Sequence, residues 1–157
     1  MIVMGLNVGK SFMRWVTVSG TLEVPELLAS GSVDIDPQAS QPFIMDSLDN
    51  ALKVILDANP CDALAYRMHM GRGMTQAQVA IFHYPWGMVN LACGRRNIPV
   101  HEFIAASLTA KRFGLPKGNK PMLVCDQLAG TRPRWDDTYR YAVCAAWATL
   151  PKINGAL

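Results

Sequence analysis

Residues 1–9, "MIVMGLNVG", have the pattern of a buried strand that opens into a tight turn. The run from Ile2 to Leu6 is apolar, and Gly9 has the backbone freedom that a turn requires. Residues 11–20, "SFMRWVTVSG", then predict the partner strand of a hairpin. The polar residue near the end of the first strand is Asn7. Metal and phosphate sites at such a strand end usually place a carboxylate there, so the amide requires an explanation.

The rest of the chain predicts further strands and helices in an alternating order. We expect one or two edge strands within 21–36, where Pro25 and Gly31 interrupt a β-rich run. We further expect a loop at 38–43, an amphipathic helix over 45–60, a strand at 61–68, a long helix from Thr75 to about Arg96, a strand at 98–103, and helices at 121–130 and 136–150. Pro85 should kink or break the long helix. This order predicts an α/β fold, a sheet with helices on both faces, and the length of 157 residues predicts one domain over 1–157.

Composition excludes several classes of protein. Half of the residues are hydrophobic and 17% are charged, so the chain is not of the disordered type. No apolar run reaches the roughly 18 residues that span a bilayer, and the N-terminus lacks the features of a signal peptide. The four cysteines show no CxxC spacing, which argues against a zinc site or a disulfide framework. We therefore expect a cytoplasmic protein without a membrane partner.

The net charge of +3 hides an uneven distribution. Between residues 63 and 125 the single acid is Glu102, whereas the basic residues there are Arg67, Arg72, Arg95, Arg96, Lys111, Arg112, Lys117 and Lys120. A region of this size in which nearly all charges are positive favours a polyanion as partner. The other interpretation is a solvated surface that keeps the protein in solution.

Four segments, taken in order, resemble one family of proteins. They are "MIVMGLNVG", "GRRNIPVHEF" at 94–103, "SLTAKRFGLPKGNK" at 107–120, and "DDTYRYAVCAAWA" at 136–148. Each is a weak signal alone, but together they resemble the RuvC-type Holliday-junction resolvases of bacteria and their phages. The resemblance implies a ribonuclease-H-like fold with a mixed five-stranded sheet, a role in DNA recombination and a homodimer formed through the long helix at 75–96.

The resemblance also implies a catalytic site, and this sequence departs from it. In the family, four carboxylates hold two Mg²⁺ ions that clamp the attacking and leaving oxygens of a phosphodiester. They come from the first strand, the fourth strand and two positions three apart in the last helix. The matching positions here are Asn7, Arg67, Asp137 and Arg140, of which only Asp137 keeps a carboxylate. No shift of register restores the set, because acids are absent before Glu23, from 63 to 101, and after Asp137.

Two arginines in place of acids put fixed positive charge where a metal would lie. One interpretation is that they hold DNA phosphates without cutting the strand. The other is that they pair with Asp136 or Asp137 and fill a catalytic pocket that is no longer active. The resemblance and the charge together suggest DNA contacts by Arg67, Arg72, Lys111, Arg112, Lys117, Lys120 and Arg140, with Lys111 and Lys120 at positions that contact the DNA backbone or lie beside the metal site. The aromatic segment "FHYPWGM" at 82–88 is either a stacking platform for bases or the packed face of the long helix.

Three hypotheses for function follow. The first is a nuclease-deficient RuvC-like protein, a pseudoenzyme, that binds branched or duplex DNA and needs no cofactor. The second is an active Mg²⁺-dependent junction endonuclease in which Asn7 is an inactivating replacement, with Asp136, Asp137 and a further acid as ligands. The third is a protein-interaction module or inhibitor that reuses the fold.

Overall fold

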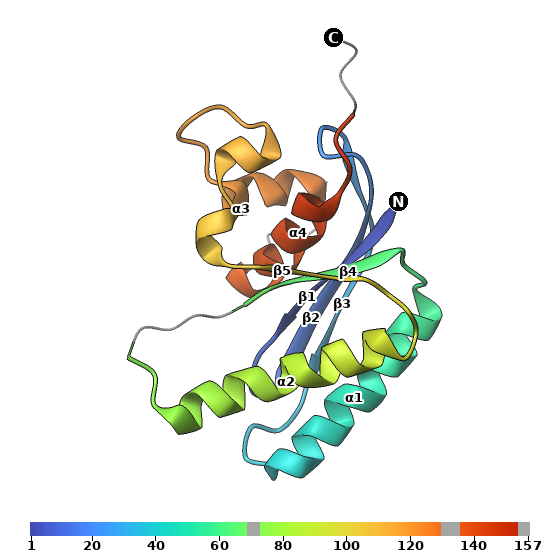
Figure 1. Ribbon diagram of the computed structural model, residues 1–157, viewed down its shortest axis with the longest axis vertical. Helices are drawn as coiled ribbons and strands as arrows, with labels where there is room; N and C mark the ends of the chain where they lie inside the picture. Colours follow the sequence, from blue (N-terminus) through green and yellow to red (C-terminus); the bar gives the residue numbers. More distant parts are fainter. Residues whose placement is uncertain (69–72, 130–135, 154–157) are drawn as a thin grey trace.

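The computed structural model describes residues 1–68, 73–129 and 136–153 and contains one mixed sheet with helices on both faces (Figure 1). In chain order the elements are β1 (Ile2–Val8), β2 (Phe12–Gly20), β3 (Pro25–Asp34), α1 (Gln41–Ala58), β4 (Ala63–Arg67), α2 (Gln76–Gly94), β5 (Val100–Phe103), the short 3₁₀ helices η1 (Ala105–Ser107) and η2 (Ala110–Phe113), α3 (Pro121–Val124), η3 (Cys125–Ala129) and α4 (Asp137–Thr149). The predicted α/β fold with a five-stranded sheet is confirmed.

The sheet has the strand order β3-β2-β1-β4-β5, with the opening strand at its centre. β1 pairs antiparallel with β2, and β2 pairs antiparallel with β3. On the other side, β1 pairs in parallel with β4, and β4 with β5. The strand β1 is central because it is apolar on both faces, whereas β3, which contains Pro25 and Gly31, lies at an edge as predicted.

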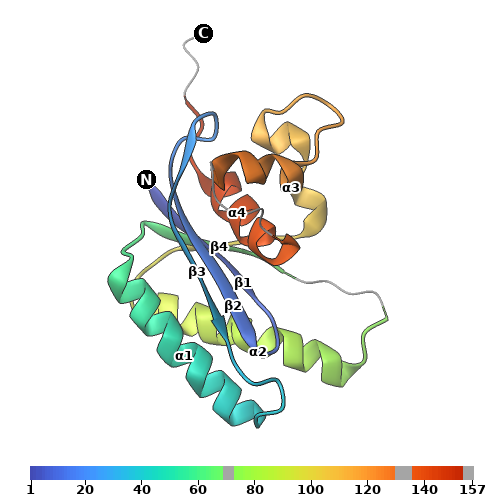
Figure 2. The same ribbon diagram turned by 180° about the vertical axis from the view of Figure 1, so that it is seen from behind.

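The two faces of the sheet are covered by different helices, as Figures 1 and 2 show. α1 and α2 pack on one face, over a core that includes Met4, Leu6 and Tyr66. α4, with α3 and η3 beside it, packs on the other face over Val3 and Ala65. Because side chains alternate along a strand, Asn7 lies on the face that α4 covers.

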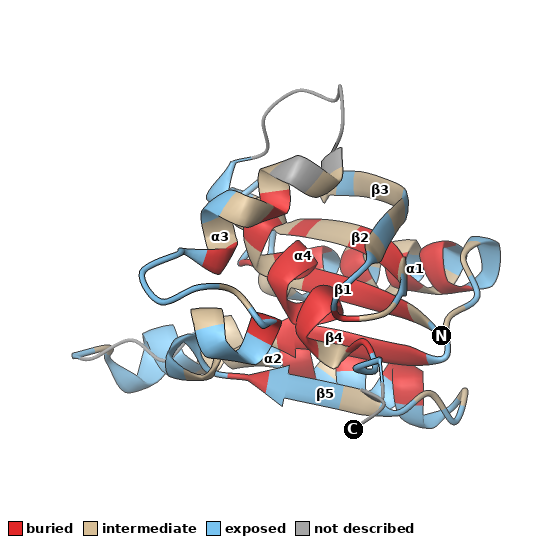
Figure 3. Ribbon diagram, turned by 90° about the horizontal axis from the view of Figure 1, so that it is seen from above, coloured by how far each residue is buried: buried red, intermediate tan, exposed pale blue. Residues whose placement is uncertain are grey.

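The helix α4 approaches β1 unusually closely. A Cβ placed on Gly5 would lie 2.0 Å from the carbonyl oxygen of Ala142 and 2.9 Å from the Cβ of Ala146. Glycine in the strand and alanines in the helix therefore allow the two backbones to come together. In Figure 3 the middle of the sheet and most of α4 are buried, whereas much of β5 at the edge is exposed.

Three local expectations differ from the structure. The helix α1 begins at Gln41, within the segment expected to be a loop, because Pro42 lies in the first turn, where its missing N–H is harmless. The helix α2 runs from Gln76 to Gly94 through Pro85 without a break, and Thr75 caps it in a capping box with Gln78. The expected helix at 121–130 is one short α-helical turn followed by η3. Among the described residues, every helix is too short or too polar to cross a bilayer.

Candidate functional site

Asn7 and Arg67 lie together where β1 and β4 end. The two strands are parallel, and their paired residues finish with Leu6 opposite Tyr66, one residue before Asn7 and Arg67. The Asn7 amide Nδ2 donates a hydrogen bond of 2.9 Å to the carbonyl oxygen of Thr138 in α4. The Arg67 guanidinium lies over the ring of Tyr141, with its Cζ 3.9 Å from the ring centroid. Both side chains thus point to the face that α4 covers.

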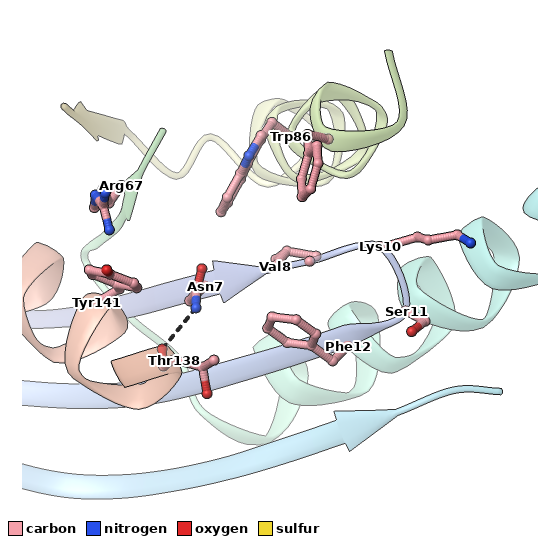
Figure 4. Close-up of a pocket in the computed structure, with 11 residues that line it drawn as sticks. Asn7, Val8, Lys10, Ser11, Phe12, Arg67, Trp86, Thr138 and Tyr141 are labelled. Atoms are coloured by element: carbon pink, nitrogen blue, oxygen red, sulfur yellow. Dashed lines mark hydrogen bonds between the residues drawn. The ribbon is translucent and has the colours of Figure 1, made fainter. Parts of the chain in front are cut away.

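A pocket of about 420 Å³ opens beside these residues (Figure 4). It lies between α2, α4 and the turn that joins β1 to β2. Its polar side chains are Asn7, Lys10, Ser11, Arg67 and Thr138, and its aromatic side chains are Phe12, Phe82, Trp86 and Tyr141. The ring of Trp86 is stacked on that of Tyr66, with 3.9 Å between centroids, so this wall of the pocket is firmly packed.

The α4 residues that face the pocket are Thr138 and Tyr141, not the predicted pair Asp137 and Arg140. Both pairs have the spacing of three that places side chains on one face of a helix. The residues of α4 that face the pocket are thus one position later in the sequence than expected, which corresponds to a rotation of the helix about its own axis. None of the four side chains at the strand-end site therefore carries a carboxylate; they are Asn7, Arg67, Thr138 and Tyr141.

Arg140 is turned away from the pocket and is held by two acids. Its Nε and Nη2 donate to the carboxylate of Asp126 at 3.2 and 2.8 Å, and its Nη1 donates to Asp137 at 2.9 Å. These bonds, first to Asp126 and then to Asp137, raise the pKa of Arg140. Its side chain is only 9% exposed, and through Asp126 it links η3 to α4. The expected pairing of an arginine with Asp137 is therefore confirmed for Arg140 but is not seen for Arg67 among the described residues.

The two acids at the start of α4 are also engaged elsewhere. Asp136 is the N-cap of α4 and accepts hydrogen bonds from the backbone N–H groups of Thr138 and Tyr139. The Thr138 hydroxyl, which also donates to this carboxylate, is the main cause of the lowered pKa of Asp136. Asp137 holds Arg140 and has a side chain that is 71% exposed.

The donor set does not fit a pair of Mg²⁺ ions. Hard cations take carboxylate and other oxygen ligands, whereas the residues that line this pocket supply an amide, two hydroxyls, a phenol, a guanidinium and an ammonium. Within residues 1–68, 73–129 and 136–153, no three His, Cys, Asp or Glu side chains gather in a way that could hold a metal. Such groups suit an anion or a neutral polar group better than a metal ion.

The basic segment at 107–120 lies away from this pocket. The Arg112 Nη2 donates to the carbonyl oxygen of Ala148, near the end of α4, at 3.3 Å, and its guanidinium lies over the ring of Phe103. Ala148 is ten residues beyond Thr138, which corresponds to about 15 Å along a helix. Lys111 lines a second hollow together with Ala148 and does not line the pocket beside Asn7, so of its two expected roles contact with the DNA backbone stays a prediction. Lys117 and Lys120 are exposed, and Arg72 lies outside the described residues.

Comparisons with known proteins place this geometry in a structural class. Neither protein-family models nor curated protein sequences match the chain. Solved structures do, and those with the higher TM-scores among them include RuvC and RuvC-like Holliday junction resolvases, which have the ribonuclease-H-like fold. RuvC of Thermus thermophilus in complex with a Holliday junction superposes with a TM-score of 0.79 at 15% identity, over 94% of this chain and 91% of that one.

Two further structures agree. Another structure of Thermus thermophilus RuvC gives a TM-score of 0.75 at 16% identity, over 94% and 92% of the two chains. The yeast mitochondrial Holliday junction resolvase gives 0.64 at 12% identity, over 93% of this chain and 76% of that one. The fold of this protein is therefore the ribonuclease-H-like fold of RuvC, as the sequence resemblance implied.

Proposed function

We propose that this protein binds branched DNA, such as a Holliday junction, through its RuvC-like fold and does not cut it. The observation that carries the proposal is Arg67, a guanidinium at the end of β4, in the position where the resemblance places a metal-binding carboxylate. The Thermus structure supports a DNA partner, because that protein with the same fold is seen in complex with a Holliday junction.

Arg67 is suited to bind a phosphate. Its Nε is buried and has no hydrogen-bond partner among the described residues, and its guanidinium forms no ion pair with any of their carboxylates. An unpaired guanidinium in a partly buried site lacks the acceptors that arginine side chains normally find. The ring of Tyr141 beneath it holds the planar group in place. A phosphate in the pocket can accept hydrogen bonds in a bidentate arrangement from the two Nη groups, whereas the buried Nε is beyond its reach.

The same residue argues against metal-dependent cleavage. Two unit charges about 4 Å apart repel by about 4 kcal/mol at an effective dielectric constant of about 20. Asn7 adds no charge to offset this, and its amide is already bonded to α4. The second hypothesis, an active endonuclease that uses Asp136 and Asp137, loses support because these acids cap α4 and hold Arg140.

The quaternary structure and setting are further parts of the proposal. On α2, Ile81, Tyr84, Met88 and Leu91 recur at spacings of three and four, and Tyr84 and Leu91 are 52% and 55% exposed. This apolar stripe supports a homodimer through α2, as resemblance to the resolvases implies. A cytoplasmic role in DNA recombination, in a bacterium or phage, fits the same proposal. The hypothesis of a protein-interaction module would use this stripe without any DNA.

The proposal predicts tight, salt-dependent binding of a synthetic four-way junction. Because phosphate contacts release counterions, the logarithm of the association constant should fall linearly with the logarithm of the salt concentration. Gel-shift titrations at several salt concentrations, with a duplex of the same sequence as the control, measure both affinity and slope. Failure to bind the junction at low salt would contradict the proposal and favour the protein-interaction module.

A further inference from the structure

The pocket beside Arg67 has a composition that a phosphate contact does not explain. Besides polar groups, it has the aromatic side chains of Phe12, Phe82, Trp86 and Tyr141 around its wall. These residues come from β2, α2 and α4, so three elements of the fold bring aromatic rings to one hollow. Its volume of about 420 Å³ lies within the range of pockets that hold small organic molecules.

The polar groups of the pocket complement a nucleotide. The Nδ2 of Asn7 is bonded to α4, whereas its Oδ1 accepts no hydrogen bond from the described residues and points away from Thr138 (Figure 4). This oxygen can accept a hydrogen bond from the N–H group of a base. Arg67 supplies an unpaired cation at the same hollow, whereas the ammonium of Lys10 points away and donates to the carbonyl oxygen of Pro37 at 3.5 Å (Figure 4). Aromatic walls, an acceptor and one cation together match a planar base that carries a phosphate.

We infer that this pocket takes one unstacked nucleotide, with its base against the aromatic walls and its phosphate on Arg67. The inference rests on the proposed function for the source of that nucleotide, a strand of the bound branched DNA. Extrusion of a base into a fitted pocket is least unfavourable where pairing is already interrupted, as it is at a branch point. A free mononucleotide offers the same chemistry, and the experiment separates the two sources.

The test is photochemical. Junctions carry 5-iododeoxyuridine at positions on each side of the strand-exchange point, and after irradiation the joined peptides are identified by mass spectrometry. We expect an adduct on a pocket residue, Phe12, Phe82, Trp86 or Tyr141. We also expect Phe82→Ala to remove most of this adduct and to weaken junction binding about tenfold, because base–aromatic stacking is lost.

Matched variants separate loss of stacking from loss of folding. Phe82→Leu keeps an apolar side chain in α2 but removes the ring, and it should lose the adduct while its thermal unfolding stays close to that of the unaltered protein. Phe43→Ala removes an aromatic ring from α1 that is 59% exposed and outside the pocket, so adduct yield and affinity should not change. A second titration, by calorimetry, compares deoxyadenosine 5′-monophosphate with deoxyribose 5-phosphate.

Each outcome of these experiments either supports the inference or contradicts it. A pocket adduct that depends on Phe82 supports the inference. Junction binding with adducts only outside the pocket overturns it and leaves the proposed function intact. If the junction does not bind but deoxyadenosine 5′-monophosphate binds better than the sugar phosphate, and Phe82→Leu abolishes the difference, the pocket is a site for a free nucleotide and the proposed function fails. If neither ligand binds, both fail.

Discussion

Replacing Arg67 with alanine is expected to weaken binding of a four-way junction by about tenfold or more. Hydrogen bonds between a charged donor and a phosphate contribute about 1.5–3 kcal/mol, and here the guanidinium has no competing carboxylate among the described residues. Loss of one phosphate contact should also reduce the slope of affinity against salt by about one. Gel-shift titrations at several salt concentrations measure both quantities.

Two controls make this result specific to the pocket. Arg67→Lys keeps the charge but loses the planar fork, so its affinity should lie between those of the unaltered protein and the alanine variant. Arg95→Ala removes an exposed arginine at the far end of α2, outside the pocket, and should have a much smaller effect. Equal affinities for Arg67→Ala and the unaltered protein would refute the phosphate contact, while the absence of a metal ligand set would remain.

The second large effect concerns stability. Gly5→Ala is expected to lower the free energy of unfolding by about 3 kcal/mol or more, because the added methyl group would lie 2.0 Å from the carbonyl oxygen of Ala142. The atom that it meets belongs to a backbone and cannot rotate away, so α4 must move from β1. That movement would also strain the hydrogen bond between Asn7 and Thr138. Urea denaturation followed by circular dichroism measures the change.

Gly87→Ala is the matched control for this prediction. Gly87 lies within α2, and a Cβ there would meet nothing within 4 Å. Alanine is the better helix former by about 1 kcal/mol, so this variant should be neutral or more stable. If both variants unfolded at the same urea concentration as the unaltered protein, the close packing of α4 on β1 would be wrong.

The fold could be predicted from the sequence because its signals are local. The apolar run from Ile2 to Leu6 and the turn at Gly9 define the central strand, and Thr75 and Asp136 cap the two helices that flank the site. The lack of acids in β1 and β4 could also be read directly, since no shift of register supplies one. The structure brings Asn7 and Arg67 together at the ends of these two strands, and their role in binding stays a prediction.

The rotation of α4 could not be predicted in the same way. Residues 142–148 of this helix are all buried, and most are alanines, so apolar side chains occur on every side and mark no single face. A rotation by one residue exchanges Asp137 and Arg140 for Thr138 and Tyr141 without changing that pattern. The partner of Arg140, Asp126, lies in another element, and only the packing of η3 on α4 reveals it.

The pocket likewise depends on contacts that are distant in the sequence. The segment at 82–88 was compatible with either a stacking platform or a packed helix face, and the structure gives its residues different positions. Trp86 is 5% exposed and stacked on Tyr66, Phe82 lines the pocket, and Tyr84 is exposed. The hollow forms where α2 and α4, which cover opposite faces of the sheet, meet the turn that joins β1 to β2.

The most direct test of the central claim is a cleavage assay on a bound four-way junction. The unaltered protein and Asn7→Asp are each added at saturating concentration, with Mg²⁺ or Mn²⁺, and the labelled strands are separated under denaturing conditions. We expect both proteins to bind the junction and to leave every strand intact, because Arg67, Thr138 and Tyr141 still provide no carboxylate. Metal-dependent cuts near the branch point, by the unaltered protein or after Asn7→Asp alone, would contradict the account and identify an active resolvase.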